Sequence, residues 1–580
     1  MKRLKDVLSL SSSRLRITFM ETCRRIIQKY SLIPEFIFCG LFFYLVWMKC
    51  GLWFETNDDL IINDLLRGAI TGKPEYHTIY NSVILTAPLS LLYRIAPTIP
   101  WWGGFLLVCN GISILIPLDA IVKKSKDLFT MFCGGFAVLA CLLPSLYIRG
   151  RLQYTSTAML LAIAGFVALV LYENVAGMWL FGILEFLAFI IRPEAMEIIL
   201  PIGFGLLLVA TSITEEDFIL GIRKILISLG TALLILIIGH GVKFLAYSGN
   251  EWTASKDFEA GRQEMFDYTG IVGYDRIDEF YKRGVTKEEY DAFSHSLVLD
   301  YEHLAQAVRA ASYVSKSEVT NPGILEIIKW VYAYSYLNIL LGFTWLGIAL
   351  GAAWGVLLIV SILRGRIKSL IAFVLIYMVN KGITWGYIYY KGRMPERIML
   401  PLYFLELLSI VVILVLFIND ERRENYLRLL IIPVIAAMAY VCFVSGKQQF
   451  GTLSKQSESL PILREMESEI SNYCREHNHN KFILSTYIYS NYRRSVFDVG
   501  VDNPDYVYAG GWFSCLPSVK ARTGDYLESG YVYLITTAES INGNVEAEQA
   551  FLNQRYDYKL EKEDELNLVT GGKAVVYRVR

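Results

Sequence analysis

Repeated apolar runs of about 20 residues constrain this chain more than any other feature of its sequence. A helix of about 20 apolar residues is long enough to cross the hydrocarbon core of a bilayer, and we count about eleven such runs. They lie at residues 33–54, 101–122, 128–147, 154–172, 178–192, 195–212, 223–246, 336–363, 368–390, 398–418 and 428–446. Hydrophobic residues make up 54% of the 580 residues and charged residues only 19%. These features predict a multi-span α-helical membrane protein.

The distribution of basic residues predicts how the spans are oriented. Because cytoplasmic segments carry an excess of Lys and Arg, the basic segment 1–30 is predicted to be a cytoplasmic N-terminus that precedes an uncleaved signal anchor. A transmembrane domain over 31–446 is then expected, with outer loops at 55–100 and 247–335. The chain has no Asn-x-Ser/Thr glycosylation acceptor, which favours the cytoplasmic membrane of a bacterium over a eukaryotic secretory membrane.

Residues 447–580 are predicted to form an extracytoplasmic α+β domain. A helical pattern at 465–474 is followed by short apolar segments that favour strands, at 481–487, 531–536 and 574–579. Cys474 and Cys515 are the two cysteines of this region. Either a disulfide between them or two free thiols is compatible with the sequence.

An acidic pair, Asp58 and Asp59, follows the first span without a linker. Acidic side chains at a membrane face are costly to desolvate, so two adjacent aspartates at this depth favour a catalytic role. A structural alternative explains only one of them, because aspartate is a preferred N-cap residue. The residues after the pair, up to Gly68, are predicted to form an amphipathic helix that lies along the membrane surface.

Short outer connections between spans carry arginines, although positive charge is expected on the cytoplasmic side. Arginine pairs with phosphate in a bidentate manner and stays charged when desolvated, so these side chains would suit a lipid phosphate group. Alternatively, they bind headgroups or interact with the negative ends of helices. The five arginines are Arg149, Arg151, Arg192, Arg393 and Arg397.

Further polar residues are candidates for binding a substrate. Arg262 and Asp267 stand among aromatic residues of the second outer loop, a combination that suits a sugar or, alternatively, the core of a loop domain. His77 and Glu194 complete this predicted set. The sequence offers no convincing set of metal ligands and no nucleotide-binding motif, so no metal or cofactor is expected. Equal numbers of basic and acidic residues, 55 each, give no reason to expect a nucleic-acid partner.

Taken together, this layout resembles the C-type (GT-C) integral-membrane glycosyltransferases. The resemblance lies in the architecture of most of the chain and in a few short motifs, some of which look like uncharacterised bacterial members of that group. These motifs are Asn57-Asp58-Asp59, Tyr93-Arg94-Ile95-Ala96-Pro97, Arg192-Pro193-Glu194, the stretch from Gly392 to Arg397, and Gly510-Gly511-Trp512.

The resemblance implies a donor sugar carried on a polyprenyl phosphate and presented among membrane lipids at the outer leaflet. It further implies that Asp58 or Asp59 acts as the general base on an acceptor hydroxyl of the cell envelope, belonging to a glycan, a lipid or a protein. Inversion at the anomeric carbon would follow from direct displacement of the lipid phosphate. The five arginines would bind that phosphate. Some relatives use a divalent cation, but no residue set for one is evident here.

Two alternatives remain from the sequence. One is a transporter or flippase for a lipid-linked or anionic substrate, whose usual marks are intramembrane charge pairs and broken helices. The spans are expected to be nearly free of buried acids, which speaks against it. The other is a glycan ligase or polymerase with a lipid-diphosphate donor, which would keep the arginines but give the proton transfer to another residue.

Overall fold

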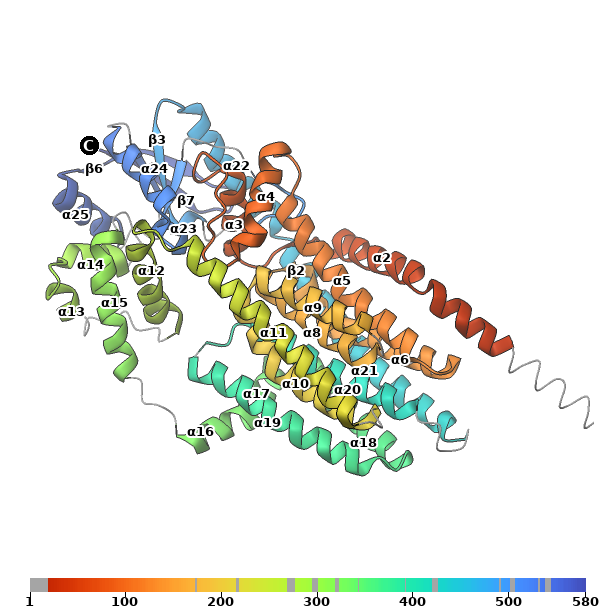
Figure 1. Ribbon diagram of the computed structural model, residues 1–580. Coiled ribbons are helices and arrows are strands. Elements are labelled where there is room, and N and C mark those ends of the chain that lie inside the picture. Colours follow the sequence, from red (N-terminus) through yellow and green to blue (C-terminus); the bar gives the residue numbers. More distant parts are fainter. Residues whose placement is uncertain are drawn as a thin grey trace, which may run out of the picture.

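The structure is a computed structural model that describes most of the chain (Figure 1). The described residues are 19–172, 175–214, 218–268, 277–294, 301–318, 323–342, 344–391, 393–419, 426–489, 492–500, 506–529, 532–537 and 544–580. Most of the basic segment predicted over 1–30 lies outside these residues, as does Gly392.

Ten helical stretches within the described residues are long and apolar enough to cross a membrane. They are α2 (Leu32–Cys50), α5 (Trp101–Lys124), α6 with α7 (Leu128–Leu142 and Leu146–Gly150), α8 (Tyr154–Leu171), α10 (Pro193–Thr214), α11 (Phe218–Ala246), α18 (Thr344–Leu363), α19 (Ile367–Lys391), α20 (Glu396–Ile418), and α21 with α22 (Tyr426–Ser457 and Leu460–Glu476). A further apolar helix, α9 (Val175–Ile191), has 17 residues and coincides with the predicted run at 178–192. The protein thus has the architecture of a multi-pass membrane protein.

Two helices form the centre of the bundle. All residues of α8 are buried, and the helix packs against α5, α9, α10 and α20. The α20 helix is buried from Leu400 onward. By contrast, α2 and α11 lie at the periphery and expose most of their apolar side chains, as expected for helices that face lipid. The long helices run side by side, roughly along one direction (Figure 1).

At two places the helical structure extends beyond a predicted span. The run predicted at 336–363 coincides with α17 (Ser335–Gly342) and α18, and residue 343 between them lies outside the described residues. Before α17 lie a short helix, α16 (Ile324–Lys329), and a wide turn of π-helix from Trp330 to Tyr334. At the other end, α21 continues to Ser457, well beyond the predicted end of the last span at residue 446.

The spans contain more buried acids than expected. Glu406 on α20 is 1% exposed and pairs with the fully buried Lys381 on α19 at 3.0 Å. Its other oxygen accepts hydrogen bonds from the Tyr336 hydroxyl and the Trp354 indole. Glu185 on α9 is also fully buried. The expectation that the spans are nearly free of buried acids is therefore wrong. The sequence did not indicate these acids because each is a single charged residue in an apolar run, and the groups that surround it belong to other helices.

The C-terminal domain is a small α+β unit at one end of the bundle (Figure 1). Its five-stranded sheet has the order β4-β3-β5-β7-β6, in which β3 pairs in parallel with β4 and β5, and β7 runs antiparallel to β5 and β6. The strands are β3 (Lys481–Ser485), β4 (Tyr506–Ala509), β5 (Val532–Thr537), β6 (Leu560–Asn567) and β7 (Lys573–Val579). The helices that accompany the sheet are α22, α23 (Thr486–Tyr489), α24 (Pro517–Glu528) and α25 (Asn544–Tyr556). Both Cys474 and Cys515 are buried free thiols.

Segments from elsewhere in the sequence gather at the same end of the bundle as this domain (Figure 1). They are α3 (Asn57–Arg67), α4 (Val83–Ile95), α12 (Glu251–Arg262), α13 (Ile277–Tyr281), α14 (Lys287–Ser294) and α15 (Tyr301–Glu318). A short parallel pairing of β1 (Trp53–Phe54) with β2 (Arg151–Leu152) ties the start of α3 to the start of α8.

The α3 helix is buried rather than exposed at a surface. It ends at Gly68 as predicted, where a φ of 86° provides the left-handed C-cap that glycine favours. Yet every residue from Asp59 to Leu66 is buried. Its polar side is covered by the C-terminal domain: the Asn63 amide donates to the carbonyl of Val499, and Asp64 pairs with Arg494. The prediction of a surface helix failed because these partners lie more than 400 residues away in the sequence.

Candidate active site

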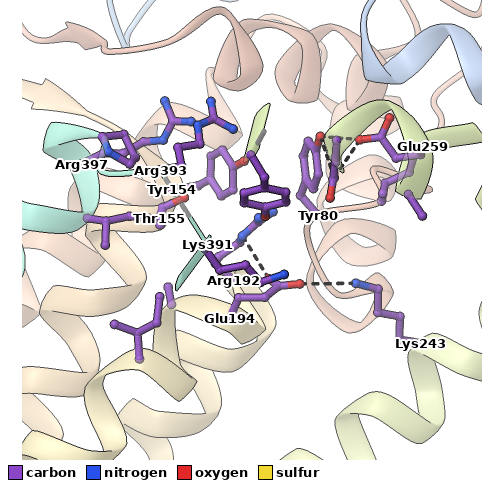
Figure 2. A pocket seen from close by; sticks show the side chains of 18 of the residues that line it. Tyr80, Tyr154, Thr155, Arg192, Glu194, Lys243, Glu259, Lys391, Arg393 and Arg397 are labelled. Atoms are coloured by element: carbon purple, nitrogen blue, oxygen red, sulfur yellow. Dashed lines mark hydrogen bonds and ion pairs between the residues drawn. The ribbon is translucent and has the colours of Figure 1, made fainter. Parts of the chain in front are cut away.

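Two adjoining cavities lie where the ends of the long helices meet the C-terminal domain. The larger has a volume of about 480 Å³ and the smaller one of about 280 Å³. Several residues line both, so we describe them as two compartments of one site. These shared residues are Tyr80, Tyr154, Arg192, Gln263, Tyr268, Arg393 and Arg397. Figure 2 shows the larger compartment from close by.

The larger, apolar compartment lies between the ends of membrane-spanning helices and α12, which contributes Trp252, Lys256 and Glu259 among others. Its apolar side chains include Ile198 of α10, Phe244 of α11, Ile388 of α19 and Ile398 of α20. Phe244 is 71% exposed, so the compartment reaches the lateral surface of the bundle, where lipid would lie. This arrangement suits an apolar chain that enters from the membrane.

The smaller, polar compartment lies between the start of α3 and the C-terminal domain. Thr56, Asn57 and Asp58 line it on the α3 side. Arg262 and Asp267, from the end of α12 and the turn after it, line it as well. The C-terminal domain contributes four lining residues: Tyr489, Gly511, Trp512 and Phe513.

The two aspartates of the acidic pair differ completely in their surroundings. Among the described residues that line the compartments, Asp58 is present and Asp59 is not. Asp58 accepts a hydrogen bond at Oδ1 from the Trp512 indole at 3.1 Å. Neither aspartate is the N-cap of α3, since that position belongs to Thr56. The N-cap explanation for one of the pair is therefore wrong.

Asp59 is 0% exposed and is held inside the protein. Its Oδ1 accepts hydrogen bonds from the Trp102 indole and the Tyr154 backbone N–H, both at 3.3 Å, and its Oδ2 accepts one from the Thr56 hydroxyl at 3.3 Å. Burial, reinforced by the charge of Asp58, raises the pKa of Asp59 well above its usual value. Asp59 therefore has a structural role inside the protein, and Asp58 is the member of the pair that can contact a ligand.

Three of the five predicted arginines converge on the boundary between the compartments. Arg192 connects α9 to α10, whereas Arg393 and Arg397 flank the start of α20, and all three line both compartments (Figure 2). Arg192 lies over the rings of Tyr80 and Tyr154, at 4.6 Å and 5.5 Å from their centroids.

The Arg192 guanidinium has room for a further partner. Its Nε pairs with Glu194 at 3.0 Å, while its Nη1 is buried and has no hydrogen-bond partner among the described residues. Burial alone would lower the pKa of Arg192, but the Glu194 carboxylate raises it above its usual value, so the side chain stays charged. A buried, charged and incompletely paired guanidinium suits an anionic ligand.

The other two arginines lie among protein groups. Arg149 is fully buried at the end of the α6–α7 span, where it donates to the Ser113 and Ser145 hydroxyls and to the Asn110 carbonyl. Arg151 pairs with Glu55 at 2.8 Å and stacks over the Tyr147 ring. Neither is among the described residues that line the two compartments. The structure thus places both among protein groups outside the two compartments, although Arg149 Nη2 and Arg151 Nε are also buried without a hydrogen-bond partner among the described residues.

Three of the four residues predicted to bind a substrate line the site. Arg262 and Asp267 belong to the polar compartment, and Asp267 pairs with Arg262 at 3.5 Å and with Arg393 at 3.2 Å. Glu194 lines the apolar compartment. His77 is placed elsewhere: it pairs with Glu75 at 2.8 Å and packs against the Trp252 ring.

Several lining residues escaped the sequence analysis. Lys243 and Lys391 add positive charge to the apolar compartment near Glu194 and Tyr268, respectively. Both stand at the ends of spans, α11 and α19, and a count of all basic residues at outer span ends would have found them. Tyr154, at the start of α8, carries no such signal. No group of three or more His, Cys, Asp or Glu side chains within the described residues could hold a metal ion.

Comparison of the sequence with models of protein families gives no match, and comparison with curated proteins gives no match either. The class of the protein is therefore described from its fold and its cavities alone. It is a helical multi-pass membrane protein with a small C-terminal sheet domain. Its charged cavity lies at the junction of that domain with the helix bundle.

Proposed function

We propose that this protein is a membrane glycosyltransferase that moves a sugar from a polyprenyl-phosphate donor to an acceptor of the cell envelope. One observation carries the proposal. Arg192, Arg393 and Arg397 line both compartments, with apolar side chains on one side and Asp58 on the other. A lipid phosphate that carries a sugar has the same order of parts: an apolar chain, an anion and a polar group.

The residues of the site suit a single displacement with Asp58 as the general base. The acceptor oxygen would attack the anomeric carbon while the bond from that carbon to the phosphate oxygen breaks. Asp58 would take the proton of the acceptor hydroxyl. The polyprenyl phosphate would leave with the bonding electron pair, and the arginines would stabilise its charge. One such displacement inverts the configuration of the anomeric carbon.

This function implies an orientation in the membrane. The positive-inside bias supports an N-terminus in the cytoplasm of a bacterium, and hence a site and a C-terminal domain on the outer side of the cytoplasmic membrane. Polyprenyl-phosphate sugars exposed in the outer leaflet would then enter the apolar compartment laterally, beside Phe244 of α11.

Transfer of labelled sugar by the purified full-length protein tests the proposal. Synthetic polyprenyl-phosphate sugars would serve as donors and a cell-envelope fraction as the source of acceptor. Asp58→Asn is expected to lower the rate by about 100-fold or more, the usual contribution of a general base, whereas the adjacent Asp59→Asn is expected to retain transfer. Undiminished transfer in Asp58→Asn would remove this residue from the mechanism and favour a lipid-diphosphate ligase.

A transporter or flippase is the second candidate, and the buried Lys381–Glu406 pair favours it. Intramembrane ion pairs are typical of transport proteins. Here, however, Glu406 has its oxygens occupied by Lys381, Tyr336 and Trp354, as expected for a pair that locks helices together. Flux of a labelled lipid-linked sugar in proteoliposomes tests this candidate, and flux without any transfer would replace our proposal with it.

A further inference from the structure

The C-terminal domain forms part of the wall of the polar compartment. Its turn at Gly510 and Gly511, with φ of 92° and 79°, sends Trp512 toward α3, a backbone course that glycine favours. The Trp512 ring packs against Tyr80, with 5.0 Å between the ring centroids. Its indole N–H reaches Oδ1 of Asp58 at 3.1 Å, across 454 residues of sequence.

Further contacts fix the domain to both ends of α3. The Tyr489 hydroxyl donates to the carbonyl of Asn57 at 2.6 Å. One helical turn after Leu60, Asp64 meets the fully buried Arg494 at 2.7 Å, and Arg494 also pairs with Glu467 of the domain. Beyond the end of the helix, Arg522 donates to the carbonyl of Ile70 at 2.7 Å. The domain therefore cannot shift without disturbing the helix that carries Asp58.

The contact with Trp512 leaves Asp58 oriented but not saturated. An ionised carboxylate has two oxygens and accepts several hydrogen bonds. Trp512 occupies Oδ1, and Asp58 lines the polar compartment, so the carboxylate can still accept a proton there. A hydrogen bond to a carboxylate is among the stronger ones in proteins, which makes the indole an effective restraint on the rotamer of Asp58.

We infer that Trp512 is a positioning residue for the base Asp58, and that the C-terminal domain is thereby an integral part of the active site. The inference rests on the proposed function. On this inference the C-terminal domain does more than cover the cavity, because through Trp512 it holds the base Asp58 in the direction of the acceptor hydroxyl.

The chain offers a matched pair of variants for the test. Trp512 and Trp102 each donate an indole N–H to one of two adjacent aspartates, at 3.1 Å and 3.3 Å. Phenylalanine keeps an aromatic ring and removes the donor. In Trp512→Phe we expect kcat for sugar transfer to fall about 10-fold or more, with the KM for the polyprenyl-phosphate donor unchanged. In Trp102→Phe we expect kcat per folded molecule within about twofold of wild type.

The outcomes separate the inference from the function on which it rests. Wild-type protein that transfers sugar, with equal kcat in Trp512→Phe, overturns the inference and leaves the function standing. An equal fall in both variants, or a rise in the donor KM alone, also overturns it. Absence of transfer by the wild type removes the function and the inference together. Should Trp512→Phe fail to fold, Trp512→Leu also removes the indole donor, and the same loss of kcat at constant KM is expected; an unchanged kcat there overturns the inference.

Discussion

Replacing Asp59 by asparagine tests whether this buried carboxyl is neutral in the folded protein. Burial raises the pKa of Asp59 well above its usual value, and the charge of Asp58 adds to the effect. A protonated carboxyl and a carboxamide have nearly the same shape, and neither is charged. The asparagine Oδ1 can still accept from Trp102 and Tyr154, while its amide donates to the Thr56 hydroxyl. Asp59→Asn is therefore expected to fold and to be no less stable than wild type near neutral pH.

The raised pKa of Asp59 determines how the stability of Asp59→Asn relative to wild type changes with pH. In the unfolded chain Asp59 titrates near 3.8, and in the folded protein it titrates at higher pH. Between these two values the folded state keeps a proton that the unfolded state has released, so this residue makes the protein less stable as the pH rises. Asparagine lacks this dependence. The stability of Asp59→Asn relative to wild type should therefore grow from about pH 4 upward, until the pH passes the folded pKa.

The Asp59→Ala variant shows how much folding stability is lost when the hydrogen bonds to this side chain are removed. Asp59→Ala leaves the Trp102, Tyr154 and Thr56 donors without an acceptor in a buried place. At about 1 kcal/mol for each of the three hydrogen bonds, the loss is about 3 kcal/mol. Thermal unfolding of the detergent-purified variants across a pH series measures both effects. If Asp59→Asn proved as unstable as Asp59→Ala at neutral pH, or lost stability relative to wild type with rising pH, the carboxyl would be ionised and our reasoning wrong.

Three further predictions concern the charged groups around the site. Arg397→Ala should raise the donor KM about 10-fold or more, because a hydrogen bond to a charged group contributes about 1.5–3 kcal/mol; an unchanged KM in transfer assays would exclude Arg397 from donor binding. Arg494→Met should destabilise the protein by about 3–5 kcal/mol, since it removes the guanidinium that pairs with the buried Asp64 and Glu467 and leaves them with the longer contacts of 3.4 Å to Arg67 and Arg464, and limited proteolysis should then release the C-terminal domain. Lys381→Met should lower the unfolding temperature for the same reason, and adding Glu406→Leu should restore it; no recovery in the double variant would contradict the view of this pair as a structural lock.

The sequence predicted the membrane architecture well because the signal for a span is local. A run of about 20 apolar residues is sufficient by itself, and nearly every predicted run coincides with a helix of the structure. The strands at 481–485, 532–537 and 573–579 were anticipated for the same reason. The buried pair of Lys381 and Glu406 escaped notice because each residue is a single interruption of an apolar run.

The site was harder to predict, because adjacent residues on a helix point about 100° apart. That geometry gives Asp58 and Asp59 different directions, and only the packing of α3 decides that Asp58 lines the polar compartment while Asp59 is buried. The arginines show the same limit. Arg149 and Arg192 both follow an apolar run and look alike in the sequence, yet Arg149 is surrounded by serine hydroxyls and Arg192 by tyrosine rings.

The polar compartment is assembled from parts that no local pattern connects. Asp58 comes from the first loop, Arg192 from the middle of the chain and Trp512 from the last domain. Because the C-terminal domain supplies four of the lining residues, the compartment is complete only when this domain is docked. Trp512 reaches Asp58 on the same helix on which Arg494 pairs with Asp64. For this reason a variant that loosens the domain, such as Arg494→Met, should lose kcat before it loses the ability to bind a lipid phosphate, whose arginines belong to the helix bundle and not to the domain.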